Sequence, residues 1–218
     1  MNQEKTIFVV IGGTSGIGKA IAQKFINENT TVHIASRSTG LDISDENAVH
    51  HYFESIGPID HLIITADSFA PSGKVIDVAI KEAKTAFDIK FWGSIHAAKH
   101  AARYLKPKGS ITLTTGMLSR KVIVNTYTKS AINAALEAVT KVLAPIRVNA
   151  VSPGLTATTA YKNMDTASRE SMYETAKQNL PVGNIGNASD VAMAYVLAVT
   201  NPYMTGSIID VDGGALIN

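Results

Sequence analysis

Residues 7–22 read IFVVIGGTSGIGKAIA, a short apolar run followed by a glycine-rich turn and then by a helical pattern. The apolar run over residues 7–11 is typical of a strand that is buried on both faces. Glycines directly after such a strand let the backbone approach a pyrophosphate, and a helix that starts there offers free N–H groups and the positive end of its dipole. The context therefore favours phosphate binding over an ordinary tight turn.

Short apolar strands and longer helical patterns alternate along the rest of the chain. Strands are predicted at 7–11, 31–35, 61–65, 110–115, 147–151 and 208–211. Helices are predicted at 16–29, 46–56, 78–105, 127–144, 167–180 and 189–200, with Ser189 as an N-cap and with Pro107 and Gly109 ending the third helix. This alternation predicts a single α/β domain over residues 1–218, with a doubly wound parallel sheet covered by helices on both faces.

Composition excludes several classes of function. The 218 residues include no cysteine, which rules out a thiol nucleophile, a disulfide scaffold and a cysteine-ligated zinc site. With 20 basic and 18 acidic residues, the formal charge is only +2, so the sequence does not show the excess of basic residues that is typical of nucleic-acid-binding proteins. His96 and His100 have helical i, i+4 spacing but no third ligand in view, so no metal site is expected.

The apolar segments are too short for a membrane protein. The amino terminus lacks the long apolar core of a signal peptide. No apolar run approaches the roughly 20 residues that span a bilayer. We therefore expect a soluble, cytoplasmic protein without a membrane partner.

The spacing of Gly12, Gly16 and Gly18 resembles the G-x-x-x-G-x-G loop of the short-chain dehydrogenase/reductase family. Further matches follow in the family's order, namely Asp42-Ile43, Ser152-Pro153-Gly154 with Thr158, and Gly206 followed by Asp212-Gly213-Gly214. The resemblance covers nearly the whole chain and implies a Rossmann-type sheet of about seven strands, with a pyridine dinucleotide across their carboxyl ends. Only four residues separate Arg37 from Asp42, so the helix that usually follows the second strand is expected to be missing.

The end of the second predicted strand indicates which dinucleotide is bound. An acidic residue there accepts hydrogen bonds from the ribose of NAD, whereas an arginine accommodates the 2′-phosphate of NADP. The sequence has Arg37 between two serines, so NADP(H) is expected in preference to NAD(H); the alternative is that Arg37 is a solvated surface charge. The expected cofactor contacts are Gly12, Thr14, Ser15, Gly16, Ile17, Gly18, Ser36, Arg37, Ser38, Asp42, Ile43, Ala66, Pro153, Gly154, Thr156 and Thr158.

The resemblance also implies a catalytic tetrad of asparagine, serine, tyrosine and lysine, and all four positions are replaced. The segment 134–144 resembles the family's sequence after its lysine and puts Asn133 at the lysine position. Lys129 then stands at the tyrosine position, and Gly116, thirteen residues earlier, at the serine position. Lys90 stands at the asparagine position. Tyr127 is followed four residues later by an alanine, so it lacks the lysine that would support it.

The candidate catalytic residues are therefore Lys129, Asn133, Thr115 and Lys90. An amine at Lys129 can donate a proton to a carbonyl oxygen if burial and the neighbouring Lys90 disfavour its ammonium form. In the other interpretation, Lys129 holds a cofactor ribose or caps a helix, and Lys90 points to solvent. Thr115 either replaces the missing serine in orienting a carbonyl or serves only as a strand residue.

We therefore expect an NADP(H)-dependent oxidoreductase that transfers hydride to or from an unidentified carbonyl or alcohol with non-standard acid–base residues. The alternative is a non-catalytic NADP(H)-binding sensor or partner subunit. The helices predicted at 78–105 and 127–144 resemble the family's interface helices, which implies a homodimer or homotetramer. The segment 159–180 is expected to form a mobile lid over the substrate.

Overall fold

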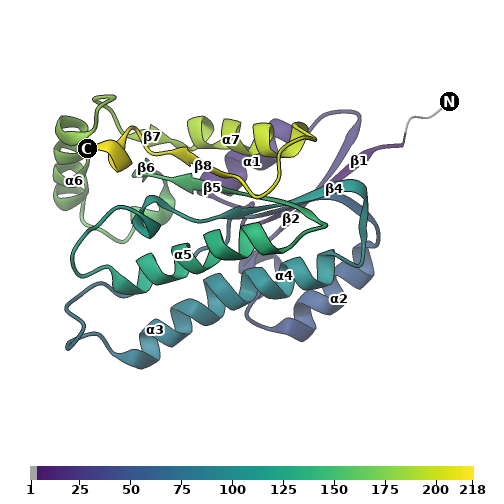
Figure 1. Cartoon of the computed structure of the whole chain (residues 1–218), viewed down its shortest axis with the longest axis horizontal. Helices are drawn as coiled ribbons and strands as arrows, with labels where there is room; N and C mark the ends of the chain where they lie inside the picture. Colours follow the sequence, from purple (N-terminus) through teal and green to yellow (C-terminus); the bar gives the residue numbers. More distant parts are fainter. Residues whose placement is uncertain (1–3) are drawn as a thin grey trace.

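Six parallel strands form the central sheet in the computed structural model, which describes residues 4–218 (Figure 1). Across the sheet, the strands follow one another as β2 (Thr30–Ala35), β1 (Thr6–Ile11), β3 (Ile59–Ile64), β4 (Leu105–Thr114), β5 (Arg147–Pro153) and β8 (Ile208–Val211). The doubly wound parallel α/β sheet predicted from the sequence is confirmed. The sheet has six strands, so the expectation of about seven was wrong by one.

The side chains of β1 alternate between two hydrophobic cores. Phe8 and Val10 pack with α1 (Gly16–Phe25) and α7 (Ala188–Thr200) on one face of the sheet, while Val9 packs on the opposite face. This alternation is why the strand reads as a continuous apolar run, since both of its faces are buried. Figure 1 shows the helices of the second face below the sheet: α2 (Glu46–Ile56), α3 (Ile80–Phe87), α4 (Gly93–Ala101) and α5 (Tyr127–Val142).

The missing strand lies at the edge formed by β2. After β2 the chain makes only a short 3₁₀ turn, Arg37–Thr39, before α2 begins. The expected loss of the helix after the second strand is confirmed, and a strand is lost with it. A parallel strand needs a crossover connection to return to the same edge of the sheet, so without this helix no further strand can pair with β2.

The long third helix ends earlier than its sequence pattern suggests. The helix runs without a break through α3, a π-helical segment at Asp88–Trp92 and α4, and it ends at Ala101. Leu105 continues the apolar pattern but begins β4, where it pairs with Ile59. Pro107 and Gly109 therefore lie in a strand and do not end a helix. The expected end at residue 105 was wrong because strand pairing overrides the local helical pattern.

Side-chain hydrogen bonds set two other helix boundaries. The Thr30 hydroxyl donates to the Phe25 carbonyl (2.5 Å), and α1 ends there instead of at residue 29. The N-cap of α7 is Asn187 and not Ser189, because the Asn187 side chain accepts from the Asp190 N–H while the Asp190 carboxylate accepts from the Asn187 N–H. Within residues 4–218, no helix is both long and apolar enough to cross a membrane.

Between β5 and α7 the chain leaves the central sheet, and a second, two-stranded sheet joins the two ends of the segment 158–185, called the excursion below. The second sheet consists of β6 (Thr156–Ala157) and β7 (Gly186–Asn187), which pair in parallel. Between them lie a 3₁₀ turn at Thr159–Tyr161 and α6 (Thr166–Asn179). Helix α6 has no fully buried residue, and Figure 1 shows it beside the sheet and outside the two helical layers.

The protein should lose stability in mild acid because of His61 in β3. Burial, assisted by the charge of Arg147, lowers the pKa of His61 to about 4 from its ordinary 6.5. Between these two values the unfolded chain binds a proton that the folded chain excludes, so the free energy of unfolding falls as the pH drops from 6.5 to 4. A shift of this size corresponds to roughly 3 kcal/mol.

The contribution of His61 can be isolated by urea denaturation at pH 7, 6, 5 and 4. His61→Gln should show a smaller loss of the free energy of unfolding over this range than the wild-type protein. The matched control is His51→Gln, since His51 is exposed on α2. The same pH dependence in all three proteins would contradict the assignment.

Candidate functional site

A groove of about 600 Å³ runs along the carboxyl ends of the central strands. The residues that follow β1, β2 and β3 and those that end β4 and β5 form its walls. In open α/β sheets this edge is where ligands bind. The structure places all sixteen predicted cofactor residues along this one groove, from Gly12 to Thr158. Their contact with a cofactor stays a prediction.

The glycine turn forms one wall of the groove. Gly12 has a positive φ of 85°, and a Cβ atom there would lie 2.6 Å from Thr65 Oγ1. A Cβ atom at Gly18 would lie 2.3 Å from the Gly12 carbonyl oxygen. No other residue fits at these two positions, so the glycine turn packs directly against the start of α1 and the end of β3. The N-cap residue, Ser15, makes no capping bond with its side chain, which leaves the first N–H groups of α1 available to an anion.

Hydroxyl groups and one arginine gather at the end of the groove beside β2. Ser36 Oγ accepts a hydrogen bond from Thr14 Oγ1 (3.2 Å) and lies 2.8 Å from Ser38 Oγ. Arg37 lines the groove beside them with its side chain exposed, and it forms no ion pair within residues 4–218. Asp42 accepts from the hydroxyl and the N–H of Ser44, and these bonds lower the pKa of Asp42. An uncommitted guanidinium among hydroxyls is suited to a phosphate group.

A smaller cavity of about 190 Å³ opens from the other end of the groove. Its apolar walls include Met117, Leu118, Ile132 and Leu155. The groove and the cavity share six residues at their junction, namely Asp67, Lys90, Thr115, Pro153, Gly154 and Tyr161. A reactant in the smaller cavity would therefore face whatever occupies this end of the groove.

Lys90 lies at this junction, with only 10% of its side chain exposed. Its ammonium is 3.2 Å from the Asp67 carboxylate and donates to the Thr115 carbonyl (3.4 Å). The π-helical segment carries Lys90, and the Ser94 hydroxyl donates to the Lys90 carbonyl (2.6 Å). π-Helical turns are frequent at functional sites. The suggestion that Lys90 points to solvent was therefore wrong, because Asp67 supplies a counter-charge inside the cleft.

Asp67 follows β3 and carries the only carboxylate that lines the smaller cavity among the described residues. Its position inside the cleft opposes ionisation. The ammonium of Lys90, the Ser68 N–H and the charge of Lys129 outweigh this effect and hold the pKa of Asp67 below its ordinary value. The carboxylate therefore stays ionised at neutral pH and compensates the charge of Lys90.

Lys129 lines the smaller cavity but is exposed. The sequence-based mechanism required Lys129 to be buried beside an uncompensated Lys90. Neither condition is met, because Asp67 pairs with Lys90 and its charge also acts on Lys129. We therefore correct that part of the hypothesis. Lys129 remains within the site, because its side chain lines the smaller cavity.

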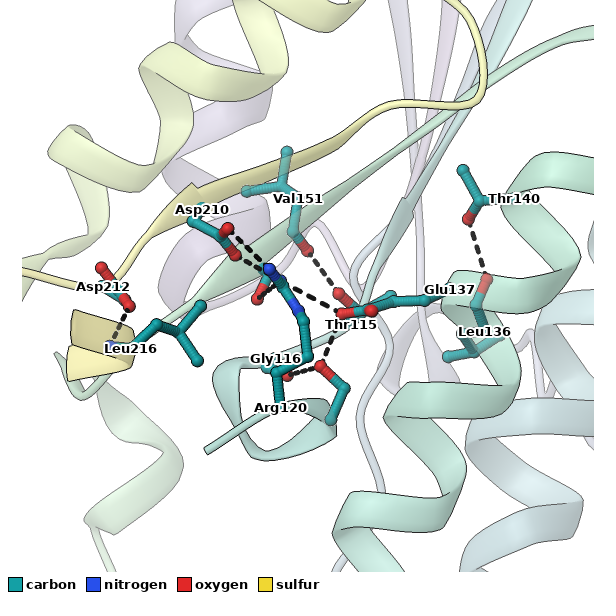
Figure 2. A network of polar contacts seen from close by, with 12 residues as sticks. Thr115, Gly116, Arg120, Leu136, Glu137, Thr140, Val151, Asp210, Asp212 and Leu216 are labelled. Atoms are coloured by element: carbon teal, nitrogen blue, oxygen red, sulfur yellow. Dashed lines mark hydrogen bonds and ion pairs between the residues drawn. The ribbon is translucent and has the colours of Figure 1, made fainter. Parts of the chain in front are cut away.

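Thr115 is not free to orient a carbonyl group. Its hydroxyl donates to the carbonyl oxygen of Val151 at 3.3 Å, as Figure 2 shows, and the residue is buried. The preceding Thr114 is committed as well, since its hydroxyl donates to the Ile64 carbonyl at 2.6 Å. Both threonines hold neighbouring strands together, so neither of them replaces the serine of the family.

Arg120 fastens the loop that follows β4 to the rest of the fold (Figure 2). Its guanidinium forms a bidentate pair with Asp210 of β8 and lies 3.3 Å from the Glu137 carboxylate of α5. The same loop contains Gly116 and Met117, which line the smaller cavity. A bidentate contact between a guanidinium and a carboxylate fixes the relative orientation of the two side chains and also contributes binding energy. Arg120 therefore holds the loop that forms one wall of the smaller cavity in a defined position.

Asn133 and Gly116 are packed against each other. Asn133 is only 5% exposed, and its amide nitrogen would lie 2.9 Å from a Cβ atom at Gly116. The asparagine therefore fills space next to the position where the family has a serine. Tyr127 lines neither cavity, as the sequence register implied, and its hydroxyl is buried.

Three polar residues that line the site were given no role of their own by sequence reasoning, namely Asp67, Tyr161 and Lys162. Tyr161 and Lys162 were included only in the segment 159–180 that was expected to form a lid. The signal for Asp67 was available, because a charged residue just past a buried strand lies at the binding edge of a parallel sheet. The position of Tyr161 depends on how the excursion between β6 and β7 folds, which no local pattern specifies.

Gly116→Ser should destabilise the protein because the new Cβ atom displaces the buried Asn133 amide. We expect a loss of about 1–2 kcal/mol in the free energy of unfolding. In the background of Asn133→Ala the same change should cost less, giving a coupling energy of at least about 0.5 kcal/mol in a double-mutant cycle. Chemical denaturation of the four proteins measures this, and strictly additive effects would contradict the proposed packing.

The sequence matches known proteins over almost its full length. Residues 12–215 match the family model described as enoyl-(acyl carrier protein) reductase. The chain is 31% identical over 257 residues to the short-chain dehydrogenase/reductase ucsE of Acremonium sp, covering 98% of this chain and 96% of that protein. It is 28% identical to the 3-oxoacyl-[acyl-carrier-protein] reductase of Rattus norvegicus, covering 95% of this chain and 97% of that protein.

Solved structures agree with these matches. A crystal structure of a small-chain dehydrogenase in complex with NADPH is 64% identical and superposes with a TM-score of 0.97, over 99% of this chain and 100% of that one. The ligand-free aldohexose dehydrogenase of Thermoplasma acidophilum is 23% identical, with a TM-score of 0.87 over 100% of this chain and 96% of that one, and shares the fold. Both the family match and the relatives lead to the same conclusion: the chain belongs to the short-chain dehydrogenase/reductase family of oxidoreductases.

Proposed function

We propose that this protein is an NADP(H)-dependent oxidoreductase that transfers hydride to or from a carbonyl or alcohol substrate. The observation that carries the proposal is the groove itself, where the glycine turn and the uncapped first N–H groups of α1 form the wall that a pyrophosphate can approach. The uncommitted Arg37 among Thr14, Ser36 and Ser38 supports a 2′-phosphate at the far end. The 64%-identical dehydrogenase in complex with NADPH supports the same cofactor.

A dinucleotide bound along the groove would contact different residues with each of its parts. The glycine turn and the start of α1 would hold the pyrophosphate, and Asp42 with Ile43 would border the adenine. Pro153, Gly154 and Thr158 line the end next to the smaller cavity, where the nicotinamide would lie. The nicotinamide supplies or accepts the hydride when it is bound.

The chain itself must then bind the substrate and move one proton. Lys129 is the candidate proton donor, because it is the lysine at the wall of the smaller cavity that forms no ion pair within residues 4–218, and an amine there can give a proton to a carbonyl oxygen that becomes an alkoxide. Lys90 and Asp67 hold each other in place at the junction and keep the local charge balanced. Asn133 would shape the cavity next to Gly116. This division of roles favours reduction, since the reverse direction needs a neutral amine as base.

The second candidate function is a non-catalytic NADP(H) sensor or partner subunit. The observation that favours it is the replacement of all four tetrad positions, by Lys90, Gly116, Lys129 and Asn133. NADPH consumption over a panel of aldehydes and ketones separates the two functions, because a sensor binds NADPH without oxidising it.

We also propose that the protein is a homodimer or homotetramer, in the cytoplasm, with no nucleic-acid or membrane partner. The helices that resemble the family's interface elements carry exposed apolar side chains, among them Ile80, Trp92 and Val142. Burial of such side chains against a second copy would remove apolar surface from water.

NADPH should bind more tightly than NADH, and Arg37→Asp should remove this preference. The substitution takes away a charge-assisted phosphate contact worth roughly 1.5–3 kcal/mol and adds a repulsive carboxylate. Titration calorimetry should therefore show NADPH affinity falling by at least about tenfold while NADH affinity is retained. Arg103→Asp, which makes the same charge change at an exposed site outside the groove, serves as the control. Equal NADPH and NADH affinities in the wild-type protein would contradict the proposal.

Lys129→Met should abolish turnover while leaving NADPH affinity nearly unchanged. The reason is that Lys129 lines the smaller cavity, whereas the phosphate-binding turn lies at the other end of the groove. Lys141→Met, at an exposed position further along α5, should behave like the wild type. Initial rates and NADPH titrations of the three proteins provide the test. A parallel fall of affinity and turnover would instead mean that Lys129 holds the cofactor ribose.

A further inference from the structure

The six residues at the junction of the groove and the smaller cavity contain few polar groups that remain available to a ligand. The Lys90 ammonium is bound to the Asp67 carboxylate and to the Thr115 carbonyl. The Thr115 hydroxyl is bound to the Val151 carbonyl. The Gly154 N–H donates to the Val211 carbonyl (2.9 Å). Proline has no N–H group, and the ionised Asp67 can only accept.

Besides the third N–H of the Lys90 ammonium, the hydroxyl of Tyr161 is the side-chain donor that remains available among these six residues. Tyr161 lines both the groove and the smaller cavity, and none of the other six tyrosines lines either one. Within residues 4–218 its hydroxyl forms no hydrogen bond, and it is not among the buried polar atoms that lack a partner, so it remains accessible. The hydroxyl of Tyr161 can therefore donate to a ligand at the place where the two spaces meet.

Local structure holds the ring of Tyr161 in place while leaving the hydroxyl free. The residue ends the 3₁₀ turn Thr159–Tyr161, and the Thr158 side chain caps this turn by accepting from the Ala160 N–H (3.3 Å). The ring packs edge-to-face on Tyr173 of α6, with centroids 6.1 Å apart and an interplanar angle of 89°. A ring held in this way presents its hydroxyl without a large loss of side-chain entropy on binding.

The electrostatic surroundings keep this hydroxyl protonated. Burial, the neighbouring Tyr173 and the charge of Asp67 all raise the pKa of Tyr161. The phenol therefore remains a hydrogen-bond donor at neutral and mildly alkaline pH and does not become a phenolate.

We propose that Tyr161 donates the hydrogen bond that holds the substrate's carbonyl oxygen, the role that neither Thr115 nor Gly116 can fill. This inference rests on the proposed reductase function and adds a residue from a part of the chain that the family resemblance did not single out. Tyr161 binds and polarises the carbonyl, and Lys129 supplies the proton. The substrate is accordingly an aldehyde or ketone that enters through the smaller cavity.

The test compares Tyr161→Phe with Tyr173→Phe. Each substitution removes one hydroxyl and keeps the edge-to-face ring pair, so both proteins should retain their fold and their NADPH affinity. With 4-nitrobenzaldehyde and NADPH, kcat/KM should fall by about 10- to 100-fold in Tyr161→Phe and stay near the wild-type value in Tyr173→Phe. The pH dependence of the residual activity should keep its wild-type shape, because the hydroxyl does not transfer the proton.

A second measurement separates failure of this inference from failure of the reductase function. 4-Nitrobenzamide has a carbonyl group that is not reduced, and its binding to the NADPH complex can be followed by calorimetry. Tyr161→Phe should weaken this binding by about tenfold, and Tyr173→Phe should not. If the wild-type protein oxidises no NADPH but shows this difference in binding, the reductase function fails while the role of Tyr161 stands.

Three results would overturn the role of Tyr161. The first is turnover and amide binding that are the same in Tyr161→Phe and Tyr173→Phe, which would leave the reductase function intact. The second is a pH profile that loses its alkaline limb only in Tyr161→Phe, which would make Tyr161 the proton donor. The third is a wild-type NADPH complex that neither reduces the aldehyde nor binds the amide.

Discussion

The backbone contact between the glycine turn and the end of β3 is the constraint on which the binding edge depends. The Gly12 carbonyl lies where a Cβ atom of Gly18 would be, and Thr65 donates to the Ile11 carbonyl through both its N–H (2.8 Å) and its hydroxyl (3.0 Å). Strands β1 and β3 and helix α1 therefore meet closely, with only the hydroxyl of Thr65 between them. This close junction aligns the strand ends, so residues from five strands line one continuous groove.

The residues that replace the family's tetrad each have a complementary neighbour in the site, either in charge or in size. A buried ammonium such as that of Lys90 is tolerated only with a counter-charge, and Asp67 provides one from a different strand end. The asparagine at position 133 occupies space beside Gly116, where a larger residue would collide with it. Each pair joins segments that are far apart in the sequence. The site is thus a packed, charge-balanced arrangement and not an enzyme site with its side chains simply removed.

Most of the sheet and the phosphate-binding turn could be predicted from the sequence because both depend on local patterns. Apolar runs buried on both faces marked the strands, and the glycine spacing marked the turn. Errors occurred where distant pairing decided the outcome. Leu105 follows a helical pattern in the sequence but pairs with Ile59 in the sheet. The sheet has six strands and not seven, because the connection that would lead to a strand beside β2 is missing. The counter-charge of Lys90 and the position of Tyr161 likewise depend on contacts between remote segments, which periodicity does not encode.

The excursion between β6 and β7 is attached to the sheet more weakly than any other part of the site. Its two ends are joined by a ladder of two residues each, and α6 buries no residue completely. A segment with so few apolar contacts opens at a small fraction of the free energy of global unfolding. Because Tyr161 and Lys162 belong to it, one local opening removes both the roof of the groove and two of its polar side chains. Such an opening leaves the six paired strands of the central sheet in place, so the glycine turn and the strand ends keep their positions when this segment detaches.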